Sequence, residues 1–482
     1  MSTPTFEATI GLEVHAQLLT RTKLFCGCEA TFGAPPNTHV CPVCLGLPGA
    51  LPVLNREAVR MGVRAARALG LTILPRSIFA RKNYFYPDLP KGYQITQYDR
   101  PFSEDGALEI AVPGAGPKIA RIQRIHLEED AGKSLHEPGR ARVDLNRAGV
   151  PLIEIVGHPD LSSGEEAAIY LRALRDVLVC VGVNDGNLEE GSFRCDANVS
   201  IRPVGRADLG ARVELKNINS FRFVERAIGS EIARQRAVLE TGGTIAQETR
   251  GWDEATGTTF AMRSKEEAHD YRYFPDPDLP PLDIDLALVR EIDRALPELP
   301  AAKRARYMDS LGLPRQAAEV LTSHPRLSAF YEDALAAGAD PVKAANFVGS
   351  EVLREARAHG LAMDLPVRAR DVARLLTLVE EGTISGKQAK AVFARMCGTG
   401  KTPDDVVAEL GLSQILDPDE IRRLCVAVVA ANEKSAIAWR AGKKALLGFF
   451  VGQVMKASSG RANPALVNEI LVQVLSTVAE EP

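Results

Sequence analysis

Four cysteines near the amino terminus form the pattern in this sequence with the most specific chemical meaning. Cys26 and Cys28 are separated by one residue, and after twelve further residues Cys41 and Cys44 are separated by two. Two close thiolate pairs that a loop brings together are typical of tetrahedral zinc sites, and this spacing resembles a zinc ribbon or knuckle. We expect a structural zinc ion, because four protein ligands leave no open position for chemistry. His39 is an alternative to one ligand, and four buried free cysteines are the alternative to a metal site.

Carboxylates at alternating positions of predicted strands form a second candidate site. Glu13 and His15 share one face of a strand predicted near the amino terminus. Asp196 and Glu214 lie on the polar faces of two further predicted strands, and the run Glu128–Asp130 adds three acids. Mg²⁺ binds a few carboxylates gathered from separate strands, together with nucleotide phosphates. The alternative is ordinary solvated salt bridges, since the chain has 62 acidic residues.

The segment Ala131–Ser134, which reads Ala-Gly-Lys-Ser, is similar to the end of a phosphate-binding Walker A loop. Leu127 stands where such a loop needs its first glycine, and three acids precede the turn. Acids at that place would repel phosphates unless a metal ion intervened. We therefore exclude a P-loop, although Lys133 could still meet a phosphate through such an ion.

Cations and aromatic residues alternate in two segments that are far apart in the sequence. One segment runs from Lys82 to Asp88 and is followed by Lys91 and Tyr98, and the other runs from Asp270 to Asp276. Such segments stack a base or an adenosine on their rings while the cations hold phosphate. The alternative is that these rings, which lie beside prolines, are core or turn residues.

Basic residues surround an apolar stretch, residues 445–454, near the carboxyl end. They are Arg440, Lys443, Lys444, Lys456 and Arg461. Basic side chains around a helical hairpin are able to contact nucleic-acid phosphates. The alternative is the ordinary solvated rim of a buried helix.

The elements that would position these groups change character along the chain. Short alternating runs predict half-buried strands in the first part, interrupted by helices at 164–181 and 224–240. After the proline-rich segment 274–281 the chain is rich in Ala, Leu, Arg and Glu at helical spacing, and a second break falls at 398–403. We therefore predict an α+β multidomain protein with a mixed α/β domain at 1–285, an all-α domain at 286–400 and a small all-α tail at 401–482.

Composition limits the classes of protein that need to be considered. The chain has 482 residues, of which 45% are hydrophobic and 25% charged, which is typical of globular proteins with several domains. The first ten residues carry no basic or apolar leader, and the longest apolar run is interrupted by Gly and Gln. We therefore expect no contact with a membrane and a cytoplasmic location. A net charge of −4 leaves any binding of nucleic acid to local basic clusters.

A series of segments, in order along the chain, resembles the B subunit of the bacterial aspartyl/glutamyl-tRNA amidotransferase. The segments are Ile10–Leu18, Arg81–Asp88, Leu127–Ser134, Val143–Arg147, Pro151–Ile155, Glu189–Ser200, Glu214–Ser220 and Asp270–Pro275. The resemblance implies a cradle-like first domain with an inserted zinc-ribbon-like loop, followed by an all-α domain and a tail that binds tRNA.

The resemblance also implies an activity, a glutamine-dependent aminoacyl-tRNA amidotransferase. ATP would phosphorylate the side-chain carboxylate of Glu-tRNA(Gln) or Asp-tRNA(Asn), and ammonia would displace phosphate to give Gln-tRNA(Gln) or Asn-tRNA(Asn). An amidase A subunit would release the ammonia from glutamine, and a small C subunit would complete a heterotrimer. This chain carries no Ser/Ser/Lys amidase pattern of its own, so the ammonia would come from a partner.

The resemblance assigns roles to residues by motif. The implied Mg²⁺ ligands are Glu13, His15, Glu129, Asp196 and Glu214, and the last four of these are the expected catalytic residues. The implied substrate contacts are Lys82, Tyr84, Lys91 and Arg272. The implied tRNA contacts are Lys443, Lys444, Lys456 and Arg461. Some family members lack the four cysteines, so zinc is not essential to the family's chemistry, but here we expect it to be bound by Cys26, Cys28, Cys41 and Cys44.

Two other functions compete with this hypothesis. A non-catalytic scaffold that binds zinc and tRNA would use the cysteines and the tail, but it has little need for carboxylates on several strand faces. A metal-dependent hydrolase would use those carboxylates, but the chain has only eight histidines and no HExxH motif. The carboxylates therefore favour the amidotransferase over the scaffold, and the sparse histidines disfavour the hydrolase.

Overall fold

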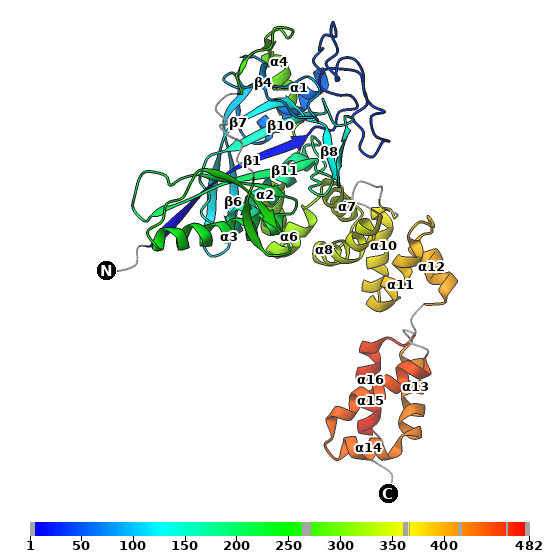
Figure 1. The fold of residues 1–482 in the computed structure, drawn as a ribbon. Helices are drawn as coiled ribbons and strands as arrows, with labels where there is room; N and C mark the ends of the chain where they lie inside the picture. The colour runs from blue at the N-terminus through cyan, green and yellow to red at the C-terminus, as the bar shows by residue number, and fades with distance from the viewer. Residues whose placement is uncertain are drawn as a thin grey trace. The chain divides into compact units, whose positions relative to one another are not determined.

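Figure 1 shows the computed structural model of the chain, which describes residues 5–262, 271–359, 365, 367–412, 417–458 and 461–477. The chain divides into two compact units, residues 1–300 and 301–482. Among the described residues, no helix is both long enough and apolar enough to cross a membrane.

A nine-stranded sheet is the centre of the first unit. Its strand order is β14 (Thr258–Ala261), β13 (Glu248–Asp253), β12 (Val213–Ile218), β11 (Phe193–Pro203), β1 (Phe6–Gln17), β10 (Pro151–Gly157), β7 (Gly116–Glu129), β6 (Ser103–Val112) and β2 (Thr72–Ile73). Neighbouring strands are antiparallel except for β12 and β13, which are parallel. The first strand of the sequence therefore lies in the middle of the sheet, next to strands that come more than 130 residues later.

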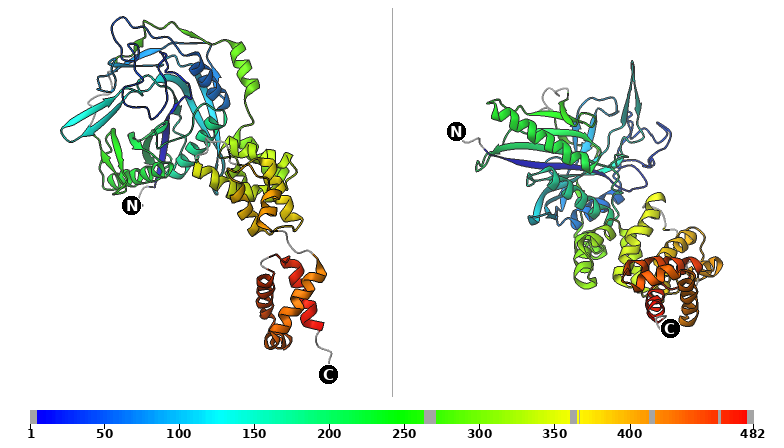
Figure 2. Two further views of the ribbon diagram at one scale, coloured as in Figure 1. Left: turned by 90° about the vertical axis from the view of Figure 1, so that its right-hand side faces the viewer. Right: turned by 90° about the horizontal axis from the view of Figure 1, so that it is seen from below.

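The two faces of the sheet differ because apolar and polar residues alternate along the central strands. On β1, the side chains of Ile10, Leu12 and Val14 are buried in the core. Helices α2 (Gly164–Cys180) and α3 (Phe221–Glu240) pack together over this apolar face, and Figure 2 shows the long α3 running alongside the sheet. The two helices predicted at 164–181 and 224–240 are confirmed. The other face of the central strands carries the polar side chains.

Smaller elements surround the sheet. Helix α1 (Arg56–Ala68) contacts β7 and β10. Three short strands, β4 (Ala80–Asn83), β5 (Tyr93–Thr96) and β15 (Phe274–Pro275), form a second sheet in which Phe274 pairs with Arg81. Two-stranded pairs are formed by β3 (Arg76–Ser77) with β16 (Leu282–Asp283), and by β8 (Lys133–Glu137) with β9 (Arg140–Asp144). The second sheet brings together the two segments of alternating cations and aromatic rings, although almost 190 residues separate them.

The last helix of the first unit is α4 (Leu286–Ala295). It packs against α1, adds Val289 and Ile292 to the core of the first unit, and forms an ion pair between Arg60 and Glu291. The sequence predicted a domain boundary after residue 285. The first compact unit extends to residue 300, because the amphipathic helix α4 contributes to the core of that unit.

The second unit is entirely helical among its described residues. One core is shared by α5 (Pro300–Leu311), α6 (Arg315–Leu321), α7 (Pro325–Ala336), α8 (Pro341–Phe347), a π-helical turn (Val348–Val352), α9 (Leu353–His359), α10 (Ala369–Glu380), α11 (Gly386–Met396) and α12 (Pro403–Leu410). A separate core is formed by α13 (Pro418–Ala431), α14 (Glu433–Arg440), α15 (Leu447–Ala457) and α16 (Pro464–Thr477). The predicted α+β multidomain class is confirmed, and the division into three domains stays a proposal.

Candidate functional site

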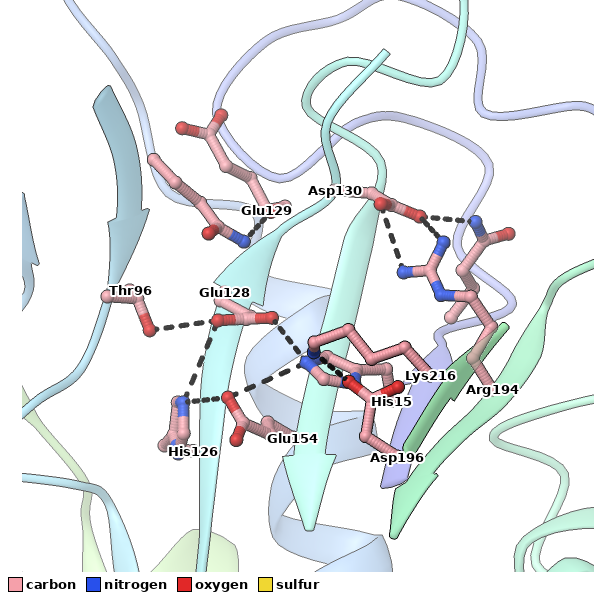
Figure 3. A network of polar contacts seen from close by, with 12 residues as sticks. His15, Thr96, His126, Glu128, Glu129, Asp130, Glu154, Arg194, Asp196 and Lys216 are labelled. Carbon is pink, nitrogen blue, oxygen red and sulfur yellow. Dashed lines mark hydrogen bonds and ion pairs between the residues drawn. The ribbon is translucent and has the colours of Figure 1, made fainter. Parts of the chain in front are cut away.

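A polar face on the central strands collects the candidate catalytic side chains. The strand register places His15 of β1 opposite Glu154 of β10, and Glu154 opposite His126 of β7. On the other side of β1, Glu13 lies opposite Asp196 of β11. Directly opposed residues of antiparallel strands project from the same face, so these side chains, which come from four different segments of sequence, meet on one surface. Figure 3 shows His15, Glu154, His126 and Asp196 on this surface.

His15, Glu128 and Glu154 form the tightest group on the polar face. The Nε2 atom of His15 lies 3.4 Å from Glu128 Oε1 and 3.7 Å from Glu154 Oε2. The hydroxyl of Thr96 donates a 3.1 Å hydrogen bond to Glu128 Oε2. The three potential ligand atoms lie within 4.8 Å of one another, and in the described part of the chain only the four cysteines form a comparable group. Two carboxylates and one imidazole are suitable ligands for Mg²⁺ or Mn²⁺.

His126 lies beside this group and is buried. Its Nε2 atom is 3.1 Å from Glu154 Oε2 and 3.8 Å from Glu128 Oε2. Burial alone would lower the pKa of His126, but the charges of Glu154 and Glu128 outweigh burial and raise the pKa to about 9. The same pairing lowers the pKa of Glu154, although burial opposes the change. An imidazolium at position 126 thus balances part of the negative charge of the two carboxylates.

The other acids predicted for the metal site lie farther along the polar face. Lys216 Nζ contacts Asp196 Oδ2 at 2.6 Å and Glu214 Oε1 at 2.9 Å. Asn198 donates a 2.8 Å hydrogen bond to Glu13 Oε1. Burial and the nearby charge of Glu154 raise the pKa of Glu13. These three acids share the face with His15 but do not belong to its three-residue group.

Glu129 points away from the polar face, as Figure 3 shows. Successive residues of a strand project to opposite sides, so β7 directs Glu128 toward His15 and Glu129 toward β5. There the Glu129 carboxylate forms an ion pair with Lys91 and accepts a 2.9 Å hydrogen bond from the backbone N–H of Ile95. The predicted metal ligand Glu129 is therefore not next to His15, and its neighbour Glu128 is.

The predicted substrate contacts fall into two places. Lys82 is beside the polar face: burial lowers its pKa, but the charge of Glu128 outweighs burial and the pKa is raised. Its ammonium also lies 4.9 Å from the centre of the Tyr271 ring, which packs edge-on against Tyr84. Lys91 lies on the far side of β7 with Glu129. Arg272 is exposed, and Asp270 of the same motif lies outside the described residues.

The four cysteines of the predicted zinc site come together. Their sulfur atoms lie within 4.8 Å of one another, and the backbone N–H of Cys41 donates to Cys44 Sγ at 3.1 Å. Hydrogen bonds from Cys26 and Cys41 and the charge of Lys23 lower the pKa of the Cys44 thiol, while the hydrogen bond to Cys44 raises the pKa of Cys26 and burial raises the pKa of Cys28. Four sulfur donors fit zinc. His39 instead lies 3.7 Å from Glu29, outside the group of sulfur atoms.

The predicted tRNA contacts lie on the surface of the four-helix element formed by α13 to α16. Lys443, Lys444, Lys456 and Arg461 are all exposed there. The Lys444 ammonium lies 3.5 Å from the centre of the buried Trp439 ring. Arg440 is held against the core by a 3.0 Å hydrogen bond to the carbonyl of Leu475. The exposed cations are thus attached to a folded helical element.

Comparison with known proteins gives the class of protein that this fold and site define. Residues 8–290 match the family described as the GatB/GatE catalytic domain, and residues 329–475 match the GatB domain. The chain belongs to this amidotransferase family, which confirms the resemblance seen in the sequence motifs.

Three relatives of the chain carry the same name, the B subunit of an aspartyl/glutamyl-tRNA(Asn/Gln) amidotransferase. The chain is 55% identical to the protein of Geotalea daltonii over 476 residues, which cover 98% of this chain and 99% of the relative. It is 53% identical to the protein of Thermodesulfovibrio yellowstonii, again over 98% and 99%, and 53% identical to that of Myxococcus xanthus, over 98% of each chain.

From the sequence, Glu128 was named only within the run Glu128–Asp130, from which Glu129 was chosen as the metal ligand, and neither Glu154 nor His126 was singled out. Glu154 lies between Ile153 and Ile155, and an acid at the centre of an apolar strand was the available signal. Whether Glu128 or Glu129 faces His15 depends on how β7 pairs with β10. The register of two strands that are distant in the sequence cannot be derived from the sequence of either strand alone.

The buried Asp130 forms an ion pair with the partly exposed Arg194 at the end of the polar face. Arg194 contacts the carboxylate with two nitrogens at 3.0 Å each, and Gln17 donates to it at 2.7 Å. Burial alone would raise the pKa of Asp130, but the charges of Arg194 and Arg147 outweigh burial and lower the pKa below the ordinary 3.8. The pair therefore stabilises the fold above about pH 4 and is lost as the pH falls through the lowered pKa.

Asp130→Asn is expected to lower the free energy of unfolding at pH 7 by about 2 kcal/mol. This loss is smaller than the loss for a fully buried ion pair, because Arg194 is partly exposed. The difference from wild type should shrink as the pH falls below about 4, because this carboxylate then takes up a proton in the unfolded chain more readily than in the folded chain. Urea unfolding at each pH measures it. A difference that stays constant down to pH 2.5 would show that the charge of Asp130 is not its source.

Proposed function

We propose that this chain is the B subunit of an ATP- and glutamine-dependent aminoacyl-tRNA amidotransferase. Its polar sheet face would activate the side-chain carboxylate of Glu-tRNA(Gln) and Asp-tRNA(Asn), giving Gln-tRNA(Gln) and Asn-tRNA(Asn). The names of the relatives support the role of the subunit. The observation that carries the chemistry is the group of His15, Glu128 and Glu154 on that face.

A carboxylate is a poor electrophile, which sets the order of the two steps. A side-chain carboxylate oxygen of the substrate attacks the γ-phosphorus of ATP and ADP leaves. Ammonia then attacks the acyl carbon, and phosphate leaves with the oxygen that came from the carboxylate. The first step brings negative groups together, so the main task of the site is to position them and to offset their charge.

Each group on the polar face has a place in this proposal. His15, Glu128 and Glu154 would hold Mg²⁺, which when bound offsets the charge of the ATP phosphates. Lys82, whose ammonium lies near Glu128, is positioned to contact a phosphate or the substrate carboxylate. Tyr84 packs against the Tyr271 ring that also contacts Lys82, and we keep it as a substrate contact together with the exposed Arg272.

The remaining acids are assigned by the face on which they lie. Glu13, Asp196 and Glu214 share the face with His15, so we keep them as candidates for contacting a nucleotide-bound Mg²⁺ ion. Glu129 is not assigned to the metal, because Lys91 and the N–H of Ile95 hold its carboxylate on the other side of β7.

Zinc is the second proposed metal and has a structural role. Cys26, Cys28, Cys41 and Cys44 would bind it and fix a loop that contains no helix or extended strand between residues 18 and 54. The arrangement of four sulfur atoms supports this assignment.

The partners follow from the proposed reaction. Ammonia would come from glutamine through an amidase A subunit, and a small C subunit would complete the heterotrimer. The exposed cations Lys443, Lys444, Lys456 and Arg461 would contact the phosphates of tRNA(Gln) and tRNA(Asn). Because the substrates are charged tRNAs, we expect the complex to work in the cytoplasm.

The reaction itself provides the test of the proposed function. In the complex reconstituted with the A and C subunits, Glu154→Gln should reduce ATP-dependent conversion of Glu-tRNA(Gln) by about 100-fold or more. Glutaminase activity and tRNA binding should persist. The control is Glu7→Gln, an acid on the same face of β1 that pairs with Arg202 far from the group and should leave the rate unchanged. Full activity of Glu154→Gln would favour the non-catalytic scaffold that binds zinc and tRNA.

The neighbouring acids of β7 provide a matched pair of variants. Glu128→Gln should weaken binding of Mn²⁺, used as a spectroscopic substitute for Mg²⁺, by about tenfold or more because it removes a charged ligand. Glu129→Gln should leave Mn²⁺ affinity unchanged, since its carboxylate faces β5. Electron paramagnetic resonance titration of the full chain measures both affinities. The opposite result, in which Glu129→Gln weakens Mn²⁺ binding and Glu128→Gln does not, would contradict the proposed site.

A further inference from the structure

Lys23 is a lysine whose side chain is completely buried beside the cysteine loop, with 0% of its surface exposed. Its Nζ atom donates one long hydrogen bond, 3.3 Å, to the carbonyl of Leu145. Within the described residues no carboxylate oxygen lies within 4 Å of it. An ammonium has three donors, and burying it without a negative partner is costly. Its environment therefore requires another source of negative charge.

The surroundings of Lys23 identify that source. Lys23 lines a cavity of about 240 Å³ together with Cys26, Cys44 and the acids Glu129 and Asp278. Both acids already have cationic partners, because Glu129 pairs with Lys91 and Asp278 pairs with Arg81 at 2.8 Å. The cysteine sulfurs are the remaining groups in this cavity that can carry negative charge.

The backbone ties Lys23 to the same loop. The N–H of Lys23 donates a 2.9 Å hydrogen bond to the carbonyl of Cys28 and so closes the turn that presents Cys26 and Cys28. A Cβ atom on Gly149 would lie 3.4 Å from Lys23 Cδ and 3.6 Å from Cys44 Cβ. The side chains of Lys23 and Cys44 therefore approach the same glycine, as does the carboxylate of Glu129, which is already paired with Lys91.

The charge of a metal–cysteine site completes the argument. Four thiolates and one Zn²⁺ ion carry a net charge of −2, and partners outside the ligand shell tune such sites. We propose that Lys23 is the positioning residue that neutralises part of this charge. Zinc binding and the burial of Lys23 then stabilise each other, and removal of zinc leaves a buried ammonium without a counter-charge. This inference rests on the zinc assignment made above.

Zinc affinity of the full-length chain tests the proposal. Lys23→Met keeps most of the length and packing of the side chain but removes its charge, and it should weaken zinc binding about 10- to 100-fold. Lys118→Met, at a lysine of the same unit that pairs with Glu166, is the control and should bind zinc as wild type does. Competition with a chromophoric zinc chelator gives the dissociation constants. Unchanged affinity in Lys23→Met would overturn the proposal.

Chemical labelling of wild-type protein tests the same coupling without relying on a folded variant. Lys23 should resist an amine-acylating reagent when zinc is bound and should react at least tenfold faster after chelation, as followed by peptide mass spectrometry. Cys44→Ser should behave like the chelated protein. Equal labelling of Lys23 with and without zinc would overturn the proposal. A wild-type chain that binds no zinc would instead contradict the zinc assignment itself.

Discussion

The pairing of β1 with its two neighbours is the constraint on which the candidate site depends. β1 carries Glu13 and His15 of the site, and β10 and β11 pair with it directly and bring Glu154 and Asp196 beside them. β7 and β12 pair in turn with β10 and β11 and so add Glu128 and Glu214. A slip of one residue would turn His15 into the helix-covered core and expose Val14 on the polar face. The apolar alternation of β1 under α2 and α3 prevents that slip, so the core and the site are specified by the same residues.

Charge balance is the second requirement of this surface. Acids gathered from separate strands would repel one another, and the structure places cations beside most of them. His126 lies between Glu128 and Glu154, Lys216 bridges two further acids, and Arg194 holds Asp130. These cations offset the negative charge of the carboxylates and hold them in place, which prepares the face for a divalent cation and a nucleotide.

The sequence predicted those features that depend on local spacing or on long motifs. The cysteine pairs, the alternating strands, the change to helices and the family were all visible, and the structure and the relatives confirm the fold class and the family. The choice between Glu128 and Glu129 and the part played by Glu154 were not visible, because they depend on which distant strands pair and in which register. The meeting of the aromatic segments through β4 and β15 has the same origin. The catalytic and binding roles of individual residues stay predictions.

Transfer of oxygen from substrate to phosphate tests most directly whether this protein activates a carboxylate. The reconstituted complex would be given ATP, glutamine and Glu-tRNA(Gln) whose side-chain carboxylate carries ¹⁸O in both positions. The account predicts one ¹⁸O atom in each inorganic phosphate released with the product, because the oxygen that attacked ATP leaves with phosphate. Inorganic phosphate without ¹⁸O, formed while Gln-tRNA(Gln) accumulates, would contradict activation of the carboxylate by phosphorylation.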